Sequence, residues 1–108
     1  MKQVSVLTEL IHQWVIDRNL QTADPKSQAL KFFEEAGEVA SGLARNDIDL
    51  VKDAIGDTYV TMVALCATLD IDIRDCIDMA YDEIKDRKGK LIDGVFVKED
   101  DLINLGLK

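Results

Sequence analysis

Acidic side chains recur at helical spacing in two neighbouring stretches of this sequence. Glu34, Glu35 and Glu38 fall within about one helical turn, and Asp53 and Asp57 lie one turn apart in the next stretch. Like charges at these spacings repel one another, so isolated helix stability does not favour the pattern. Oxygen-only ligands in this number suit magnesium or manganese. The pattern predicts a divalent metal site, with a solvated acidic helix face as the alternative.

A glycine stands directly before the last carboxylate of each stretch, Gly37 before Glu38 and Gly56 before Asp57. Glycine inside a helix costs roughly 1 kcal/mol relative to alanine. Close approach of another backbone is the usual compensation. We therefore expect two helices to pass near each other at these glycines and to bring the two acidic stretches together.

Four segments with apolar residues at helical spacing must position these carboxylates. Their expected limits are Val4 to about Arg18, Asp24–Pro25 to about Arg45, Asn46 or Asp47 to about Leu69, and Asp70 or Asp72 to near Gly89. The expected fold is all-α, a four-helix bundle-like single domain over residues 1–108 with a short C-terminal extension. Within that extension we expect Gly94–Lys98 to be extended and to pack over the helices rather than form a sheet.

The remaining distinctive side chains favour structural roles. Trp14 and Phe33 sit among aliphatic residues at helical spacing, so we expect both in the core, with base stacking as the alternative. Cys66 and Cys76 show no disulfide or zinc pattern and are expected as free, buried thiols in a reducing compartment. His12 is expected to be on the surface or half-buried.

The composition indicates a globular protein with a modest core. The chain has 108 residues, 47% of them hydrophobic, and its 13 basic and 21 acidic residues give a formal net charge of -8. Such a charge disfavours binding to nucleic acid or to an anionic membrane surface. With no secretion signal and no apolar run long enough to span a bilayer, we expect a cytoplasmic protein that forms a homodimer or homotetramer.

Four strings in order give the chain a family resemblance. They are QALKFFEEAGE at 28–38, DAIGD at 53–57, YDEIKDRKGK at 81–90 and GVFVK at 94–98. In this order and spacing, the sequence resembles the MazG-like all-α nucleotide pyrophosphohydrolases from about Trp14 to Leu102. The resemblance implies magnesium-dependent hydrolysis of nucleoside triphosphates, ribo or deoxy, to a monophosphate and pyrophosphate.

The same resemblance implies which residues hold the metal. Glu35 and Glu38 match the first ligand pair of the family, and Asp57 matches the final aspartate. The sequence departs from the family at the remaining ligand, because the expected glutamate falls on Ala54. Asp53, one residue earlier, is the expected substitute.

Other side chains are assigned to the substrate and to water. The resemblance implies that Gln28 and Lys31 face the substrate. Glu34 or Glu38 can orient the attacking water or accept its proton. Lys85 and Arg87 either bind the outer phosphates or compensate a helix C-terminus.

Two other functions compete with this one. A phosphoribosyl-ATP pyrophosphohydrolase keeps the chemistry and changes the substrate. A non-catalytic helical adaptor would instead use the acidic face to bind a basic partner, and the absence of glutamate at Ala54 keeps this alternative open.

Overall fold

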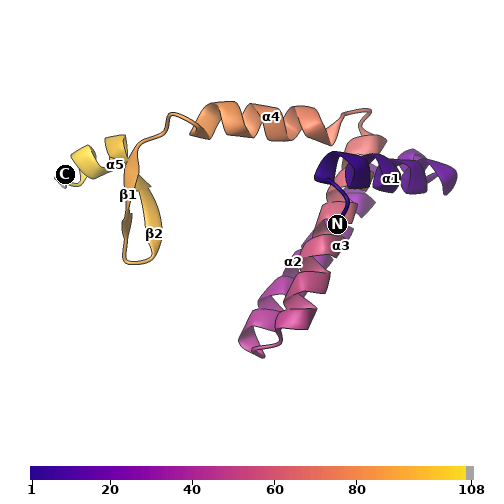
Figure 1. Ribbon diagram of the computed structural model, residues 1–108, viewed down its shortest axis with the longest axis horizontal. Coiled ribbons are helices and arrows are strands. Elements are labelled where there is room, and N and C mark those ends of the chain that lie inside the picture. Colours follow the sequence, from indigo (N-terminus) through magenta and orange to yellow (C-terminus); the bar gives the residue numbers. More distant parts are fainter. Residues whose placement is uncertain (107–108) are drawn as a thin grey trace. The chain divides into compact units, whose positions relative to one another are not determined.

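The computed structural model describes residues 1–106 of a mainly helical chain that divides into two compact units, residues 1–73 and residues from 74 onward (Figure 1). The elements are α1 (Val4–Asp17), the short 3-10 helix η1 (Leu20–Thr22), α2 (Pro25–Ala44), α3 (Ile48–Thr68), α4 (Ile73–Ile84), β1 (Gly89–Ile92), β2 (Val95–Lys98) and α5 (Glu99–Asn104). The mainly helical character is confirmed. The single domain over 1–108 stays a prediction, and its last two residues lie outside the described part.

Side-chain caps set the starts of α2 and α3. The Asp24 carboxylate accepts a hydrogen bond from the Lys26 amide at 3.0 Å, and Pro25 occupies the first turn. The Asp47 carboxylate accepts one from the Leu50 amide at 3.1 Å. Both predicted starts are therefore confirmed, with Asp47 as the cap of α3.

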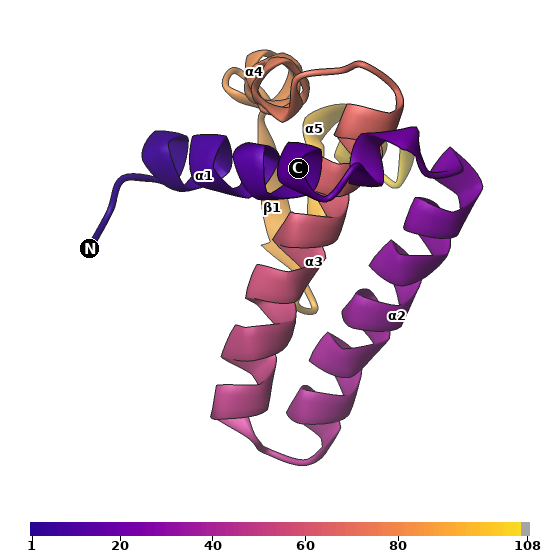
Figure 2. The same ribbon diagram turned by 90° about the vertical axis from the view of Figure 1, so that its right-hand side faces the viewer.

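Helices α2 and α3 form an antiparallel hairpin whose close approach is at Gly42 (Figure 2). A methyl group at Gly42 would lie 2.8 Å from Cγ2 of Val51 and 3.1 Å from its backbone nitrogen. In contrast, a methyl group at Gly37 or Gly56 would meet nothing within 4 Å. The prediction that these two glycines allow close helix packing is wrong, because both lie on exposed faces.

Helix α1 crosses the second half of α3 (Figure 2) and is joined to it by a partly buried hydrogen bond. The hydroxyl groups of Thr8 and Tyr59 are 2.7 Å apart, and Thr8 is only 4% exposed. Since the Thr8 hydroxyl donates to the Val4 carbonyl at 2.8 Å, Tyr59 is the donor in the inter-helix bond. The buried apolar residues of this unit are Val15, Val51, Ala54, Val63, Ala64 and Ile73.

The second half of α3 contributes two buried residues to the core of the first unit. Val63 and Ala64 are 2% and 3% exposed. Within residues 1–106, no single helix is long and apolar enough to cross a membrane. Helices α3 and α4 reach that length and composition only when counted together across the bend between them.

Several side chains expected in the core are exposed. Trp14 is 44% and Phe33 68% exposed, so their core assignment is wrong. Cys76 is also exposed, whereas Cys66 is half-buried, and neither forms a disulfide within residues 1–106. His12 is on the surface, as expected. Trp14 and Phe33 lie on sides of α1 and α2 that the other helices of the first unit do not cover.

The second unit contains a β-hairpin where no sheet was expected. Strands β1 and β2 pair antiparallel, from Gly89 opposite Lys98 to Ile92 opposite Val95. The turn residues Asp93 and Gly94 have φ values of 51° and 80°, and an Asp-Gly pair readily adopts such a turn. The expectation of an extended segment without a sheet is therefore wrong. Helix α5 packs against both strands and buries Leu102.

Three glycine-to-alanine variants test the packing of the hairpin. Gly42→Ala should lower the free energy of unfolding by about 1–3 kcal/mol, because the added methyl group overlaps Val51. Gly37→Ala and Gly56→Ala should each raise it by up to about 1 kcal/mol, since they only improve helix propensity. Urea unfolding measures all three. Stabilisation by Gly42→Ala would contradict the packing described.

Candidate functional site

The Gly42–Val51 contact determines which turns of α2 and α3 lie side by side. Because the helices are antiparallel, each step back along α2 corresponds to a step forward along α3. Glu38 therefore lies level with the turn that carries Asp53, and Glu35 with the turn that carries Asp57. The two acidic stretches found in the sequence share one side of the hairpin, which we call the acidic flank and define as Glu34, Glu35, Glu38, Asp53 and Asp57.

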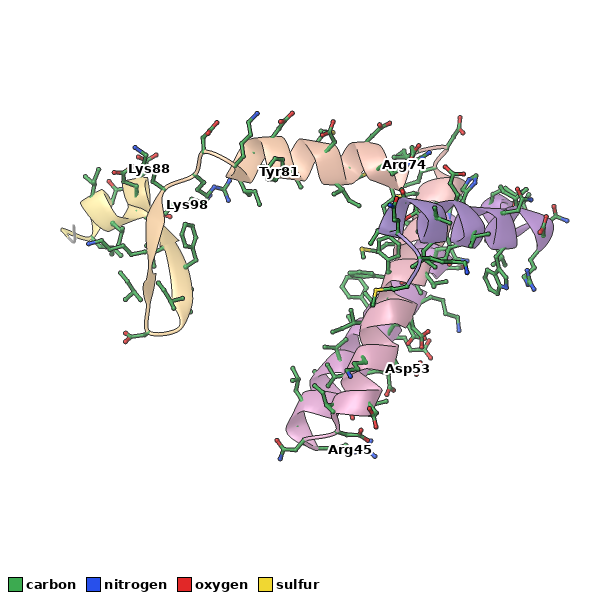
Figure 3. All side chains as sticks on the ribbon, in the orientation of Figure 1. Arg45, Asp53, Arg74, Tyr81, Lys88 and Lys98 are labelled. Carbon is green, nitrogen blue, oxygen red and sulfur yellow. The ribbon has the colours of Figure 1, made fainter. Side chains whose placement is uncertain are left out.

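The pKa of Glu35 reflects the proximity of these carboxylates. Partial burial raises the pKa of Glu35 above its usual 4.5, and the negative charges of Asp57, Glu34, Glu38 and Asp53 raise it further, in that order. Figure 3 shows side-chain oxygen atoms gathered near Asp53. The other four carboxylates of the acidic flank come from two helices, and all of them raise the pKa of Glu35.

The acidic flank is open to solvent. Glu35 is half-buried, and the other four carboxylates are exposed. Their oxygen donors have the chemistry of a site for a hard divalent cation. Within residues 1–106, however, no three histidine, cysteine or acidic side chains are placed so that they could hold a metal ion together. The carboxylates are therefore near one another without converging on one point.

The structure accounts for the absence of an acid at position 54. Ala54 is 1% exposed, and its carbonyl accepts a hydrogen bond from the Thr58 hydroxyl at 2.7 Å. A longer, charged side chain there would be placed in the core. Asp53, one residue earlier, is exposed on the acidic flank instead.

The two proposed substrate contacts on α2, Lys31 and Gln28, differ in exposure. Lys31 is exposed, and its Nζ lies 3.5 Å from Oε2 of Glu34, one turn along the same helix. Both side chains are 63% exposed, so the pair contributes little to stability. Gln28 is half-buried. The ammonium group of Lys31 therefore lies next to the acidic flank.

Lys85 and Arg87 belong to the second unit, which is described by itself. Lys85 pairs with Asp82 at 3.2 Å, and Arg87 pairs with Glu83 at 3.2 Å. Each cation thus has a carboxylate partner within one turn of the chain. Both readings of these residues, helix-end compensation and phosphate binding, stay predictions.

Large apolar side chains line the opposite side of the hairpin, a feature that the sequence analysis missed. Phe33 and Leu43 of α2 are 68% and 62% exposed, and Ile48 and Ile55 of α3 are 62% and 56% exposed. On α3, Ile48 and Ile55 lie about 140–180° from Asp53 and Asp57, and on α2 Phe33 lies about 140–160° from Glu38 and Glu35. We call these four residues, with Ala40, the apolar flank. Their spacing indicated an apolar face, but spacing alone does not tell whether the chain covers that face.

Comparison with known proteins identifies a phage relative. An uncharacterized 18.2 kDa protein in the rep-hol intergenic region of Haemophilus phage HP1 is 44% identical over 73 residues. The match covers 67% of this chain, which spans 45% of the length of the relative. No protein-family model matches the chain. No solved structure matches it either.

Asp57→Asn should lower the pKa of Glu35, because Asp57 is the strongest of the neighbouring charges that raise it. A raised folded-state pKa stabilises the protein below pH 4.5, and this stabilisation is lost as the pH rises through the folded-state value. Asp57→Asn should therefore reduce the loss of stability above pH 4.5. Carbon NMR titration of the Glu35 carboxyl group and urea unfolding across pH, both in chelator, measure the two effects.

The matched control is Asp78→Asn, which removes an exposed carboxylate from α4. It should leave the titration of Glu35 unchanged. If Asp57→Asn also leaves that titration unchanged, then the two carboxylates are not neighbours.

Proposed function

We propose that this protein is a MazG-like nucleotide pyrophosphohydrolase that converts ribo- or deoxyribonucleoside triphosphates to a monophosphate and pyrophosphate. The observation that carries the proposal is the meeting of acidic stretches from α2 and α3 around Glu35. Proximity of like charges is unfavourable unless a ligand compensates it. A divalent cation has the required charge and prefers oxygen ligands, and such a cation can also bind the phosphates of a nucleotide.

Magnesium is the proposed cofactor, with manganese as a substitute. Glu35, Glu38, Asp53 and Asp57 supply only oxygen donors, which these ions prefer. Because these carboxylates do not converge without a ligand, binding would require their side chains to turn toward a shared ion. Four of the five members of the acidic flank are exposed and have room to do so.

The proposed reaction is a hydrolysis at the α-phosphorus. The oxygen of a water molecule forms a bond to that phosphorus, the bond from it to the bridging oxygen breaks, and pyrophosphate leaves. A bound divalent cation neutralises phosphate oxygens and makes water more acidic. Glu34 or Glu38 would orient the water and accept its proton.

Four side chains are the proposed contacts of the substrate. Lys31 borders the acidic flank, so it would leave its contact with Glu34 and bind the phosphates there. Gln28, one turn earlier, would contact the substrate beside it. Lys85 and Arg87 would bind the outer phosphates after exchanging their own carboxylate partners.

The proposal places the reaction in the cytoplasm, since neither cysteine forms a disulfide within residues 1–106. Phosphoribosyl-ATP is an alternative substrate for the same chemistry. A non-catalytic helical adaptor is the alternative in which the protein is not an enzyme. The adaptor is favoured by the absence, within residues 1–106, of three ligands arranged around one point.

Glu38→Gln should abolish magnesium-dependent release of pyrophosphate, with a loss of at least about 100-fold, because it removes one candidate ligand and base. Chromatography of the products from a panel of ribo- and deoxyribonucleoside triphosphates, with phosphoribosyl-ATP included, measures the activity and the preferred substrate. Asp78→Asn, an exposed carboxylate on α4, is the matched control and should retain full activity.

A second measurement separates an enzyme from an adaptor. Magnesium should raise the melting temperature of the native protein, and Glu38→Gln should reduce that shift. No pyrophosphate from any substrate, together with no stabilisation by magnesium, would refute the proposal.

Lys31→Ala should raise KM by about tenfold while changing kcat less, because the residue is proposed to bind phosphate in the ground state. Lys26→Ala provides the control, since Lys26 is an exposed lysine on the same helix but on a different face. Steady-state kinetics with the preferred triphosphate measures both variants. Equal effects of the two substitutions would argue against a specific role for Lys31.

A further inference from the structure

The β-hairpin of the second unit has an open face and an open edge. Successive strand residues point to opposite faces of a sheet, and antiparallel partners point to the same face. Leu91 therefore shares a face with its partner Phe96, and these side chains are 74% and 50% exposed. Val97 lies on the other face and is half-buried, which places α5 there. Within residues 1–106 the sheet has two strands, so no strand pairs with the outer edge of β1.

The Phe96 ring is held in place on the open face by Gly89. A methyl group at Gly89 would lie 2.5 Å from Cζ and 2.8 Å from Cε2 of Phe96. The ring therefore lies against the backbone of β1, where only glycine leaves room for it. An apolar side chain that is fixed before binding loses little conformational entropy when a partner covers it. The open face thus presents a preformed apolar contact surface beside the edge of β1.

Basic residues are concentrated in and beside this β-hairpin. Between residues 85 and 98, five basic side chains stand against two acidic ones, which is a net charge of +3 in a protein of net charge -8. Two of the five are paired with carboxylates of α4. Lys88, Lys90 and Lys98 form no ion pair with a carboxylate within residues 1–106. Figure 3 shows Lys88 and Lys98 at the end of the β-hairpin away from its turn.

We propose that the outer edge of β1 binds an extended, acidic segment of a partner protein as a third strand. The main chain of such a segment would pair with the free edge of β1, and its apolar side chains would cover Leu91 and Phe96. Its alternate side chains would point to the other face, where Lys90 lies. Carboxylates at those positions would pair with Lys88 and Lys90.

The lysines of β1 select an acidic partner strand. Lysine on a strand edge normally opposes pairing with a further strand, because the new neighbour leaves its charge uncompensated. Carboxylates on the added strand remove that obstacle. A two-stranded hairpin is also marginally stable in water, so a third strand with an apolar face would stabilise it. The proposal does not depend on the proposed hydrolysis, which assigns no role to Lys88 or Lys90.

The rest of the chain favours a short acidic segment over a larger polyanion. Since residues 85–98 carry +3 of the total of -8, the remaining residues carry -11. Three of these charges, Glu99, Asp100 and Asp101, directly follow β2. A nucleic acid or an anionic membrane would extend beyond the β-hairpin and be repelled by such carboxylates. A single strand contacts only the basic part, and charges more than about 8 Å away are largely screened at physiological salt.

A synthetic peptide tests the proposal on the full chain. The probe is a short fluorescent peptide in which valine alternates with glutamate, and its control has glutamine in place of glutamate. The acidic peptide should bind at least about tenfold more tightly than the control at low salt, and this difference should shrink as salt is added. Fluorescence anisotropy measures the affinity. Chemical-shift changes of backbone amides, measured by NMR, should be largest in β1.

Two substitutions test the residues that carry the proposal. Leu91→Ser and Lys90→Gln should each weaken binding of the acidic peptide by about three- to tenfold, because each removes one contact of the added strand. Both side chains are exposed, so the β-hairpin should stay folded, which the amide spectrum checks. Leu30→Ser, at a leucine that is 71% exposed on α2, and Lys26→Gln are the matched controls. They should leave binding unchanged.

Four outcomes would overturn the proposal. The first is no binding of the acidic peptide, and the second is equal binding of the glutamine peptide. The third is equal loss of binding in the variants of β1 and in their controls on α2. The fourth is tighter binding of a single-stranded oligonucleotide or of anionic lipid vesicles, because the basic segment would then be a site for a polyanion.

Discussion

The packing of Gly42 against Val51 is the constraint on which the rest of the hairpin depends. No side chain larger than hydrogen fits at Gly42 without displacing Val51. The helix-propensity cost of this glycine, about 1 kcal/mol, is offset by contact between the two helices. The same contact fixes their register and so brings Glu35 level with Asp57. The contact that holds the carboxylates near one another, despite their repulsion, thus lies about two turns away, near the loop.

Much of the local structure could be predicted from the sequence, because its causes are local. Asp24–Pro25 and Asp47 begin helices through hydrogen bonds to amides two or three residues away. The two acidic stretches were also visible, since helical spacing alone places their members on one face. The prediction that the two acidic stretches lie close together across α2 and α3 was based on the wrong glycines. Gly37 and Gly56 suggested close packing, but Gly42 provides it.

The remaining features depend on tertiary contacts that spacing does not encode. Phe33 has the helical spacing of a core residue and is 68% exposed, since periodicity marks a face but not its covering. The hairpin at Asp93–Gly94 is a different case, because an Asp-Gly pair between apolar residues is a local signal for such a turn. The prediction that the tail packs over the helices without a sheet did not take this signal into account.

The two flanks of the hairpin place opposite demands on the same pair of helices. The acidic flank pushes α2 and α3 apart through charges that partial burial of Glu35 makes more costly. The first unit has only a small core with which to resist, and much of its apolar surface is uncovered. The proposed cation, bound at the acidic flank, would remove this repulsion. Binding would therefore hold α2 and α3 together more firmly than the small core does alone.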